Sequence, residues 1–336
     1  MPVTRVLSLE RHGVDEVVSE VKRVLLSGGL AVLPTETVYG VAALATIRSA
    51  VRKVFLVKER PPEPLTIHFA RLEDVESFVL DLEPLERAWR RAWPGPLTLI
   101  VRASTEVPRV VTAGLPCVGL RAPAHPLTLR VLAEAGPVVM PSANISGRPS
   151  PFTPLDAMAE MFGRVEILVD AGPCVEGLES TVVDLCRSPP KVLRLGPLSL
   201  EEIEAILGRP LEVSKRALGI DARARYRISK PLILVDGDPA EPRYVERVSS
   251  VARELASKGM KVAVLCRSSH APAYRELGLE VIELGESELD AARNLFPALR
   301  TAERIPVDIV VAESWGSRGL GLAITSRLRN AATRIV

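Results

Sequence analysis

The sequence lacks the features that mark several classes of protein. No run approaches the ~20 apolar residues that a membrane-spanning helix needs. The first residues, MPVTRVLSLERHG, contain no long apolar core of the kind that a signal peptide carries. The formal net charge is only +2, so the chain as a whole is not a polybasic coat for nucleic acid. We therefore expect a soluble protein that works in the cytoplasm.

The cysteines are few and widely spaced. None of the four, Cys117, Cys174, Cys186 and Cys266, belongs to a CxxC pair, and the four histidines are scattered. This pattern argues against a structural zinc site. We interpret the cysteines as ordinary buried thiols in a reducing compartment, with room for one incidental disulfide.

Two catalytic signatures are also missing. The Walker A pattern GxxxxGK[ST] is absent, so the chain is not a P-loop NTPase. No serine, histidine and aspartate stand out as a nucleophile with its base and orienting acid. Any reaction at this protein must therefore depend on a different set of side chains.

The chain has enough residues for two α/β domains. It has 336 residues, of which 47% are hydrophobic. Strand and helix signals mix over residues 1–213, which predicts one α/β domain. Residues 214–230 are basic with little periodicity and are typical of a linker. Strands and helices then alternate over 231–336, which predicts a smaller parallel α/β domain.

Individual elements follow from periodicity and end signals. Helical spacing over 15–27 ends at Gly28 and Gly29, and LAVLP at 30–34 is typical of a buried strand. The acidic stretch 72–80 also has helical spacing. The segment PTETVYG, residues 34–40, is expected to be a polar turn from that strand into a helix.

Basic and hydrogen-bonding residues gather where predicted elements end. Lys58 and Arg60 follow a predicted helix, and in a loop a lysine and an arginine can converge on a triphosphate. Taken alone, they are better explained as cations at a helix C-terminus. PSANISG, residues 141–147, follows a strand at the edge where open α/β sheets bind ligands, although alone it suits a plain turn.

Other strands have polar neighbours as well. Arg121 lies just past one predicted strand, Ser180 enters a second, and Arg194 ends a third. Each also suits an ordinary strand edge or surface cation. His68 lies within an apolar strand, where a histidine is more often a satisfied, half-buried residue than a catalyst.

Together these residues are rich in cations and hydroxyls and poor in carboxylates. Such a set predicts a pocket for an anionic, hydrogen-bonding ligand. Its members are Thr35, Thr37, Lys58, Arg60, His68, Arg121, Ser142, Asn144, Ser180 and Arg194.

Seven motifs, in order, resemble those of the YrdC/Sua5 family of threonylcarbamoyl-AMP synthases. They are PTETVYG, KER with PPEPLTIH, WPGPLT, VGLRAPAHP, PSANISG, ESTVVD and LRLG. AARNLFPALR and GLGLAITSRLRNAA are similar to the extra domain of the two-domain Sua5 type, so the resemblance spans essentially the whole chain. It implies an α/β protein with a YrdC-like twisted mixed sheet, flanking helices and a smaller Rossmann-like C-terminal domain.

The resemblance also implies an activity. The family makes L-threonylcarbamoyladenylate and pyrophosphate from L-threonine, bicarbonate and ATP, with Mg²⁺ held mainly by the ATP phosphates. The product feeds the t6A modification of transfer RNA through a downstream transferase complex. A carbamate oxygen that attacks the α-phosphate mainly needs positioning and charge neutralisation, which suits this residue set.

The family's motifs carry over residue by residue. Lys58 and Arg60 are implied as the catalytic residues. The implied threonine-binding residues are Thr35, His68, Arg121 and Ser180. The implied ATP-binding residues are Lys58, Arg60, Ser142, Asn144, Ser150, Arg194 and Tyr226.

The linker departs from the family. The usual PGMKYRHYAP, which forms a lid over the nucleotide, corresponds here to ARARYRISKP. Tyr226 matches, whereas Ile228 and Ser229 stand in place of a histidine and a second tyrosine. We hypothesise that Arg223 and Arg225 offset the loss by reaching phosphates.

The stretch VVAESWGSRGLG, residues 310–321, leads from a strand through glycines to a helix. Such a loop can bind phosphate at a helix N-terminus, but the spacing is not GxGxxG. Domain packing or anchoring of the lid explains it better.

Two other functions fit parts of the pattern. A YrdC-fold module that binds double-stranded RNA or tRNA would show salt-steep affinity and no turnover. An enzyme that takes its carbamoyl group from carbamoyl phosphate would turn over without bicarbonate. The threonylcarbamoyl-AMP synthase instead releases pyrophosphate only when threonine and bicarbonate are both present.

Overall fold

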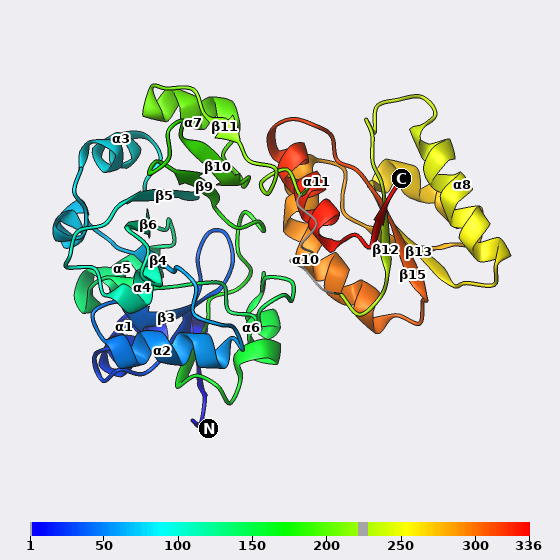
Figure 1. The fold of residues 1–336 in the computed structure, drawn as a ribbon. Coiled ribbons are helices and arrows are strands. Elements are labelled where there is room, and N and C mark those ends of the chain that lie inside the picture. The colour runs from blue at the N-terminus through cyan, green and yellow to red at the C-terminus, as the bar shows by residue number, and fades with distance from the viewer. Residues whose placement is uncertain (1, 221–227) are drawn as a thin grey trace. The chain divides into compact units, whose positions relative to one another are not determined.

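The computed structural model describes residues 2–220 and 228–336 and divides into two compact units (Figure 1). The first unit comprises Met1–Ser146, Ser150–Val175 and Glu179–Val213. The second comprises Ser214–Val336 with two short segments, Gly147–Pro149 and Glu176–Leu178. Within the described ranges, no helix is both long enough and apolar enough to cross a membrane.

The first unit is built on one mixed sheet with the strand order β1-β8-β2-β3-β7-β4-β6-β5-β9-β10-β11. The sheet contains both parallel pairs, such as β4 with β6, and antiparallel pairs, such as β5 with β6, which confirms the expected mixed α/β fold. The strands are β1 (Arg5–Ser8), β2 (Ala31–Leu33), β3 (Gly40–Leu44), β4 (Thr66–His68), β5 (Leu97–Arg102), β6 (Cys117–Arg121), β7 (Val138–Val139), β8 (Ile167–Asp170), β9 (Thr181–Asp184), β10 (Lys191–Arg194) and β11 (Glu212–Val213).

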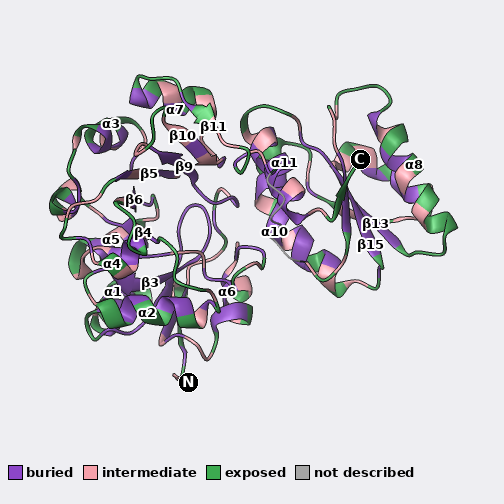
Figure 2. Cartoon of the chain, viewed as in Figure 1, coloured by how far each residue is buried: buried purple, intermediate pink, exposed green. Residues whose placement is uncertain are grey.

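Helices flank this sheet. They are α1 (Leu9–Leu26), α2 (Arg48–Val57), α3 (Glu83–Arg91), α4 (Arg109–Thr112), α5 (Pro126–Ala135), α6 (Pro154–Met161) and α7 (Leu200–Leu207). α7 begins at a serine cap, in which the Ser199 hydroxyl accepts the Glu202 N–H as part of a capping box. The apolar stripe of α1 packs with β2, β8 and α5 into a core that includes Val21, Leu33 and Val131 (Figure 2).

Two local predictions in this unit are wrong. PTETVYG joins β2 to the antiparallel strand β3, with Leu33 opposite Gly40, and so it is a strand-to-strand connection. The stretch 72–80 forms two separate 3₁₀ turns, Leu72–Asp74 and Glu76–Phe78, in place of one helix.

The second unit contains a parallel five-stranded sheet in the order β14-β13-β15-β12-β16, as the alternating pattern predicts. Its strands are β12 (Leu232–Val235), β13 (Val262–Cys266), β14 (Glu280–Glu283), β15 (Ile309–Glu313) and β16 (Arg334–Ile335). Its helices are α8 (Tyr244–Ser257), α9 (Ala271–Arg275), α10 (Glu288–Arg304) and α11 (Gly319–Ala331).

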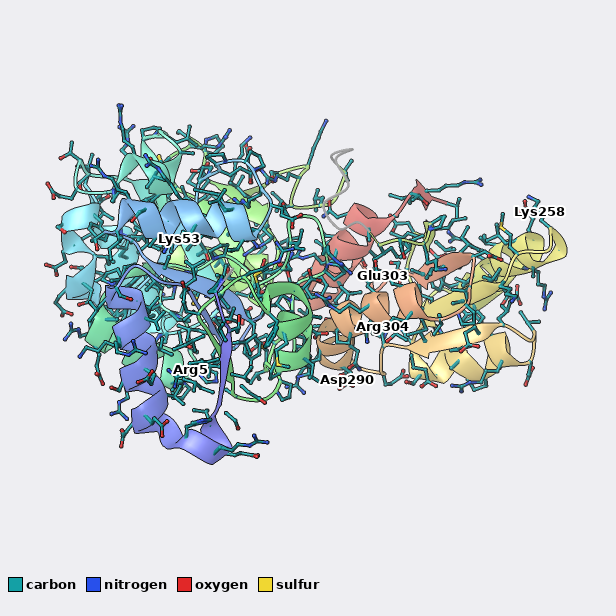
Figure 3. All side chains as sticks on the ribbon, turned by 90° about the horizontal axis from the view of Figure 1, so that it is seen from below. Arg5, Lys53, Lys258, Asp290, Glu303 and Arg304 are labelled. Atoms are coloured by element: carbon teal, nitrogen blue, oxygen red, sulfur yellow. A yellow bond between two sulfur atoms is a disulfide. The ribbon has the colours of Figure 1, made fainter. Side chains whose placement is uncertain are left out.

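Charged side chains lie on the outer faces of both units and often pair locally (Figure 3). Arg5 pairs with Glu20 in the first unit, and Lys258 pairs with Glu254 at the end of α8 in the second. This local compensation fits the small net charge of the chain.

The cysteines do not all remain thiols. Cys117, at the start of β6, forms a disulfide with Cys186, two residues after β9, while Cys174 and Cys266 are buried free thiols. The expectation of thiols therefore holds for two cysteines, and the one disulfide for which the sequence leaves room is present. Because β5 lies between β6 and β9, the disulfide links β6 to the segment that follows β9, across β5.

Candidate active site

A buried ion pair anchors the site. Nη2 of Arg121, at the end of β6, lies 2.7 Å from Oε1 of Glu36 and donates to Oγ1 of Thr37 at 2.8 Å. Its Nε donates to the Gly95 carbonyl at 3.3 Å. Oε2 of Glu36 accepts the Ala124 N–H at 2.9 Å. The guanidinium therefore has a balanced charge and a fixed orientation before any ligand arrives.

The Thr35 hydroxyl is engaged within its own loop. It donates to the Val38 carbonyl at 2.6 Å, accepts the N–H groups of Thr37 and Val38 at 3.1 and 3.0 Å, and lies 2.8 Å from the Thr37 hydroxyl. Tyr39 braces the same loop, since its hydroxyl donates to the Gly172 carbonyl at 2.7 Å. The hydroxyls of PTETVYG thus hold one conformation of this connection.

His68 lies beside Arg121 in the sheet. Strands β4 and β6 are parallel, and His68 is the register partner of Arg121. Burial lowers the pKa of His68 well below its ordinary value, and the nearby guanidiniums of Arg121 and Arg194 lower it further. The ring is therefore neutral, and its buried Nδ1 has no hydrogen-bond partner among the described residues.

Ser180 forms a third part of the same edge. Its hydroxyl lies 2.8 Å from that of Thr98 and accepts from Nη2 of Arg194 at 3.0 Å. Nε of Arg194 also donates to the Ser180 carbonyl at 2.9 Å. Next to Ser180, the Glu179 carboxylate accepts the Ser150 hydroxyl at 2.6 Å.

A separate cluster surrounds Lys58. Its Nζ donates to the carbonyls of Ser142 and Asn144, the latter at 2.8 Å. Burial, followed by repulsion from Arg60, lowers the pKa of Lys58 to about 7, while the carboxylates of Glu160 and Glu179 act in the opposite direction. A buried lysine with this pKa gains its proton readily when an anion binds beside it.

Arg60 follows Lys58 after a sharp turn. α2 ends at Val57, and Glu59 adopts a left-handed backbone with φ of 51°. Nη2 of Arg60 lies 3.0 Å from Oε2 of Glu63, and its buried Nε is unpartnered within the described part of the chain. KER therefore lies past the end of α2, where helix geometry does not force Lys58 and Arg60 to point in different directions.

The predicted residues lie at strand ends and adjoining loops, but at two different ends. The carboxyl ends of β4, β6 and β10 and the start of β9 hold His68, Arg121, Arg194 and Ser180. β7 runs antiparallel to β4, so Ser142 leaves the sheet at the opposite end from His68. The charge of Glu179, next to Ser180, raises the pKa of Lys58. The residues around Ser180 and those around Lys58 are therefore close enough to interact electrostatically.

Four residues outside the predicted set complete the site. Glu36 and Thr98 hold Arg121 and Ser180, while Glu179 holds Ser150 and acts with Glu160 on Lys58. The only sequence signal for Glu36 was its place between two threonines beside a buried strand. Tyr226, predicted to contact ATP, lies outside the described residues. Among the residues that are described, no three His, Cys, Asp or Glu form a metal-binding group.

Comparison with known proteins identifies the family. The Sua5/YciO/YrdC family model, described as telomere recombination, matches residues 23–196. A second model, described as the threonylcarbamoyl-AMP synthase C-terminal domain, matches residues 198–333. The chain belongs to the YrdC/Sua5 family. Within that family it has both domains, as its motifs predict.

Full-length relatives agree with this assignment. The threonylcarbamoyl-AMP synthase of Pyrococcus abyssi is 39% identical over 317 residues, which cover 90% of each chain. The enzyme of the same name from Bacillus subtilis is 34% identical, over 95% of this chain and 93% of its own. A crystal structure of P. abyssi Sua5 complexed with L-threonine has a TM-score of 0.87 and 35% identity, with 99% of each chain covered.

Proposed function

We propose that this protein is an L-threonylcarbamoyladenylate synthase. It makes threonylcarbamoyl-AMP and pyrophosphate from L-threonine, bicarbonate and ATP, and is thus an enzyme of the nucleotidyltransferase type. The observation that carries this proposal is the match along the whole chain to P. abyssi Sua5, whose structure holds L-threonine. The inventory of buried cations and hydroxyls agrees with such substrates.

The threonine end of the site is the edge around Arg121. The Arg121 fork, steadied by Glu36, receives the threonine carboxylate. His68 is neutral, and its Nδ1 has no partner among the described residues, so it offers a hydrogen bond without adding charge. The Ser180 hydroxyl is a second polar contact. The Thr35 hydroxyl already donates within its own loop. Thr35 therefore contributes to threonine binding by fixing the conformation of that loop.

The nucleotide end is the cluster around Lys58. Lys58 and Arg60 neutralise the phosphates, and Ser142, Asn144 and Ser150 supply short hydrogen-bonding groups. Arg194 is bonded to Ser180, so we place it at the junction where the α-phosphate meets the threonine derivative.

The reaction then follows from positioning. The threonine amine and bicarbonate condense to a carbamate with loss of water. A carbamate oxygen attacks the α-phosphate in line, and the bond to the pyrophosphate leaving group breaks as the new P–O bond forms. Lys58 and Arg60 offset the negative charge on the phosphates, and burial keeps water from the labile carbamate and adenylate.

Magnesium fits this scheme as an ion carried by ATP. Since the described residues hold no three-carboxylate cage, Mg²⁺ would bind through phosphate oxygens and water, where it supplies further charge neutralisation.

Residues 214–230 are proposed as the linker that joins a catalytic domain, 1–213, to a C-terminal domain, 231–336, and that forms a lid over the active site. The proposed lid contacts, Tyr226 with Arg223 and Arg225, lie outside the described residues. The product passes to a transferase complex that modifies tRNA, and the enzyme therefore acts in the cytoplasm.

The decisive test measures pyrophosphate release by the full chain. We expect release only with L-threonine, bicarbonate and ATP together, and incorporation of labelled bicarbonate into the adenylate. Pyrophosphate release with carbamoyl phosphate in place of bicarbonate would show that carbamoyl phosphate donates the carbamoyl group. Salt-steep RNA binding with no turnover under any substrate combination would instead support the RNA-binding module.

A further inference from the structure

The C-terminal sheet has a ligand-binding geometry of its own. All five strands are parallel, so their carboxyl ends lie at one end of the sheet, the end at which the C-terminus follows β16 (Figure 1). The chain leaves β13 toward β14 on one side and leaves β15 toward β16 on the other. The direction therefore switches between the neighbours β13 and β15, and open α/β sheets bind ligands at such a point.

Two side chains at this switch point have buried donors without partners. The Arg267 guanidinium follows β13 and lies over the Trp315 ring, which follows β15, with Cζ 4.1 Å from the ring centre. Trp315 is only 1% exposed, and its Nε1 has no hydrogen-bond partner in the described part of the chain. The same holds for Nε of Arg267. Native proteins rarely leave buried donors unpaired, so this pair points to an absent acceptor.

His270 adds a third donor. Its Nδ1 lies 2.8 Å from Oε1 of Glu313, a fully buried carboxylate at the end of β15. The Glu313 carboxylate raises the pKa of His270, so the imidazole holds a second proton more readily. Nε2 of His270 makes no hydrogen bond with any residue that the structure describes.

Two nearby carboxylates, Glu313 and Glu286, already accept hydrogen bonds. Glu313 also accepts from the Tyr274 hydroxyl at 2.5 Å and from the backbone N–H of Arg267 at 2.9 Å. Both oxygens of Glu286 bond to Ser269, one to its N–H at 2.9 Å and one to its hydroxyl at 3.0 Å. Glu313 and Glu286 therefore already accept hydrogen bonds, while Arg267 and Trp315 keep buried donors without a partner among the described residues, which favours an oxyanion there.

The helix end itself is not the binding element. Glu288 Oε1 lies 2.7 Å from where a Cβ on Gly321 would stand, so a carboxylate already faces the first turn of α11. The loop before it is open, however. A Cβ on Gly316 or Gly319 would meet nothing within 4 Å, which leaves space beside the loop that follows Trp315.

We propose that the carboxyl end of the C-terminal sheet is a second ligand site, which takes a phosphate-bearing anion through Arg267, Trp315 and His270. The Arg267 guanidinium, whose Nη1 already donates to the Glu286 carbonyl at 3.4 Å, and the indole N–H bond to phosphate oxygens. His270 lies three residues after Arg267 in the connection that follows β13 and offers Nε2 when its ring is protonated. The site is formed by residues of the second unit alone and shares no residue with the one described above.

The test uses the Trp315 indole N–H as its own reporter. The full chain contains three tryptophans, so ¹⁵N-labelled protein shows three indole signals, and Trp315→Phe assigns the one of interest. We titrate inorganic phosphate, pyrophosphate and AMP against chloride at matched ionic strength. We expect a saturable shift of the Trp315 signal with the phosphate compounds, and at least a ~10-fold weaker affinity in Arg267→Ala.

Matched variants keep the result interpretable. Arg253→Ala removes an exposed arginine of α8 in the same unit and should leave the titration unchanged. His270→Gln tests the third donor without touching the stacked pair and should also weaken binding. A Trp315 signal that moves no further than with chloride overturns the proposal, as does an equal shift in Arg267→Ala. Tighter binding of AMP than of phosphate supports it and identifies a nucleotide as the ligand.

Discussion

Oε1 of Glu36 lies 2.7 Å from Nη2 of Arg121, and each side chain is more than nine-tenths buried. Removal of one partner from such a pair leaves a charge that neither water nor protein balances. We expect Glu36→Ala to lower the free energy of unfolding by about 3–5 kcal/mol. It should also raise the KM for threonine more than that for ATP, because Arg121 loses its fixed orientation. Denaturant unfolding and initial rates measure the two effects.

An exposed ion pair is the matched control for Glu36. Glu254→Ala breaks the surface pair with Lys258 and should change stability by less than about 1 kcal/mol. Equal losses from the two variants would show that the Glu36–Arg121 pair has no special role.

Thr35 should act through its loop. Thr35→Val keeps the shape of the side chain but leaves the N–H groups of Thr37 and Val38 without their acceptor. We expect a loss of about 1–3 kcal/mol in unfolding free energy, with a raised threonine KM and nearly unchanged ATP affinity. Thr35→Ser retains the hydroxyl and should restore both. If Thr35→Val raised the threonine KM at full stability, the hydroxyl would meet the substrate directly.

Lys58 should make nucleotide binding depend on pH. Its pKa is lowered to about 7, so the free protein loses this charge as the pH rises through that value. The phosphates bind the charged form. Affinity for ATP should therefore be highest below about pH 7 and fall by up to about tenfold per pH unit above it, until the pKa of the complex is reached. Calorimetry across this range measures the slope and the proton uptake.

The unfolding free energy should depend on Lys58 in the opposite direction, because it should rise with pH where ATP affinity falls. The folded pKa of Lys58 lies below its ordinary value of 10.5, so the unfolded chain binds more protons between about pH 7 and that value. Its contribution to the unfolding free energy should therefore rise with pH across this window. Lys58→Met removes this slope, and Lys58→Arg, which stays charged, should remove the pH step in ATP affinity. A step that survives in Lys58→Arg belongs to another group.

The disulfide should stabilise the first unit. Cys117 and Cys186 are 69 residues apart in sequence, and their bond restricts the unfolded chain. We expect the double variant Cys117→Ser, Cys186→Ser to lose about 2–4 kcal/mol of unfolding free energy. Reductant should lower the stability of the original protein to the same level and leave the double variant unchanged. No difference between oxidised and reduced protein would show that the cysteines are not paired in solution.

Much of the fold follows from local pattern. The Ser199 cap and the apolar spacing after it predict α7, and the alternation after residue 231 predicts a parallel sheet, because both signals act over a few neighbouring residues. The failures are also local. GVAAL at 40–44 is rich in small residues and has few of the β-branched and aromatic side chains that mark strands. Its role as β3 depends on pairing with β2, which no local pattern encodes.

The order of residues determines which chemical groups this protein has: a lysine and an arginine past a helix, hydroxyls after buried strands, and an arginine at the end of another. Tertiary structure decides how they pair. Arg121 meets Glu36 across 85 positions, and Lys58 meets the Asn144 carbonyl across 86. Burial removes the water that would otherwise solvate these groups, so each must take whatever partner the fold brings to it. Burial lowers the pKa of Lys58 and of His68, and the partner Glu36 fixes the orientation of Arg121.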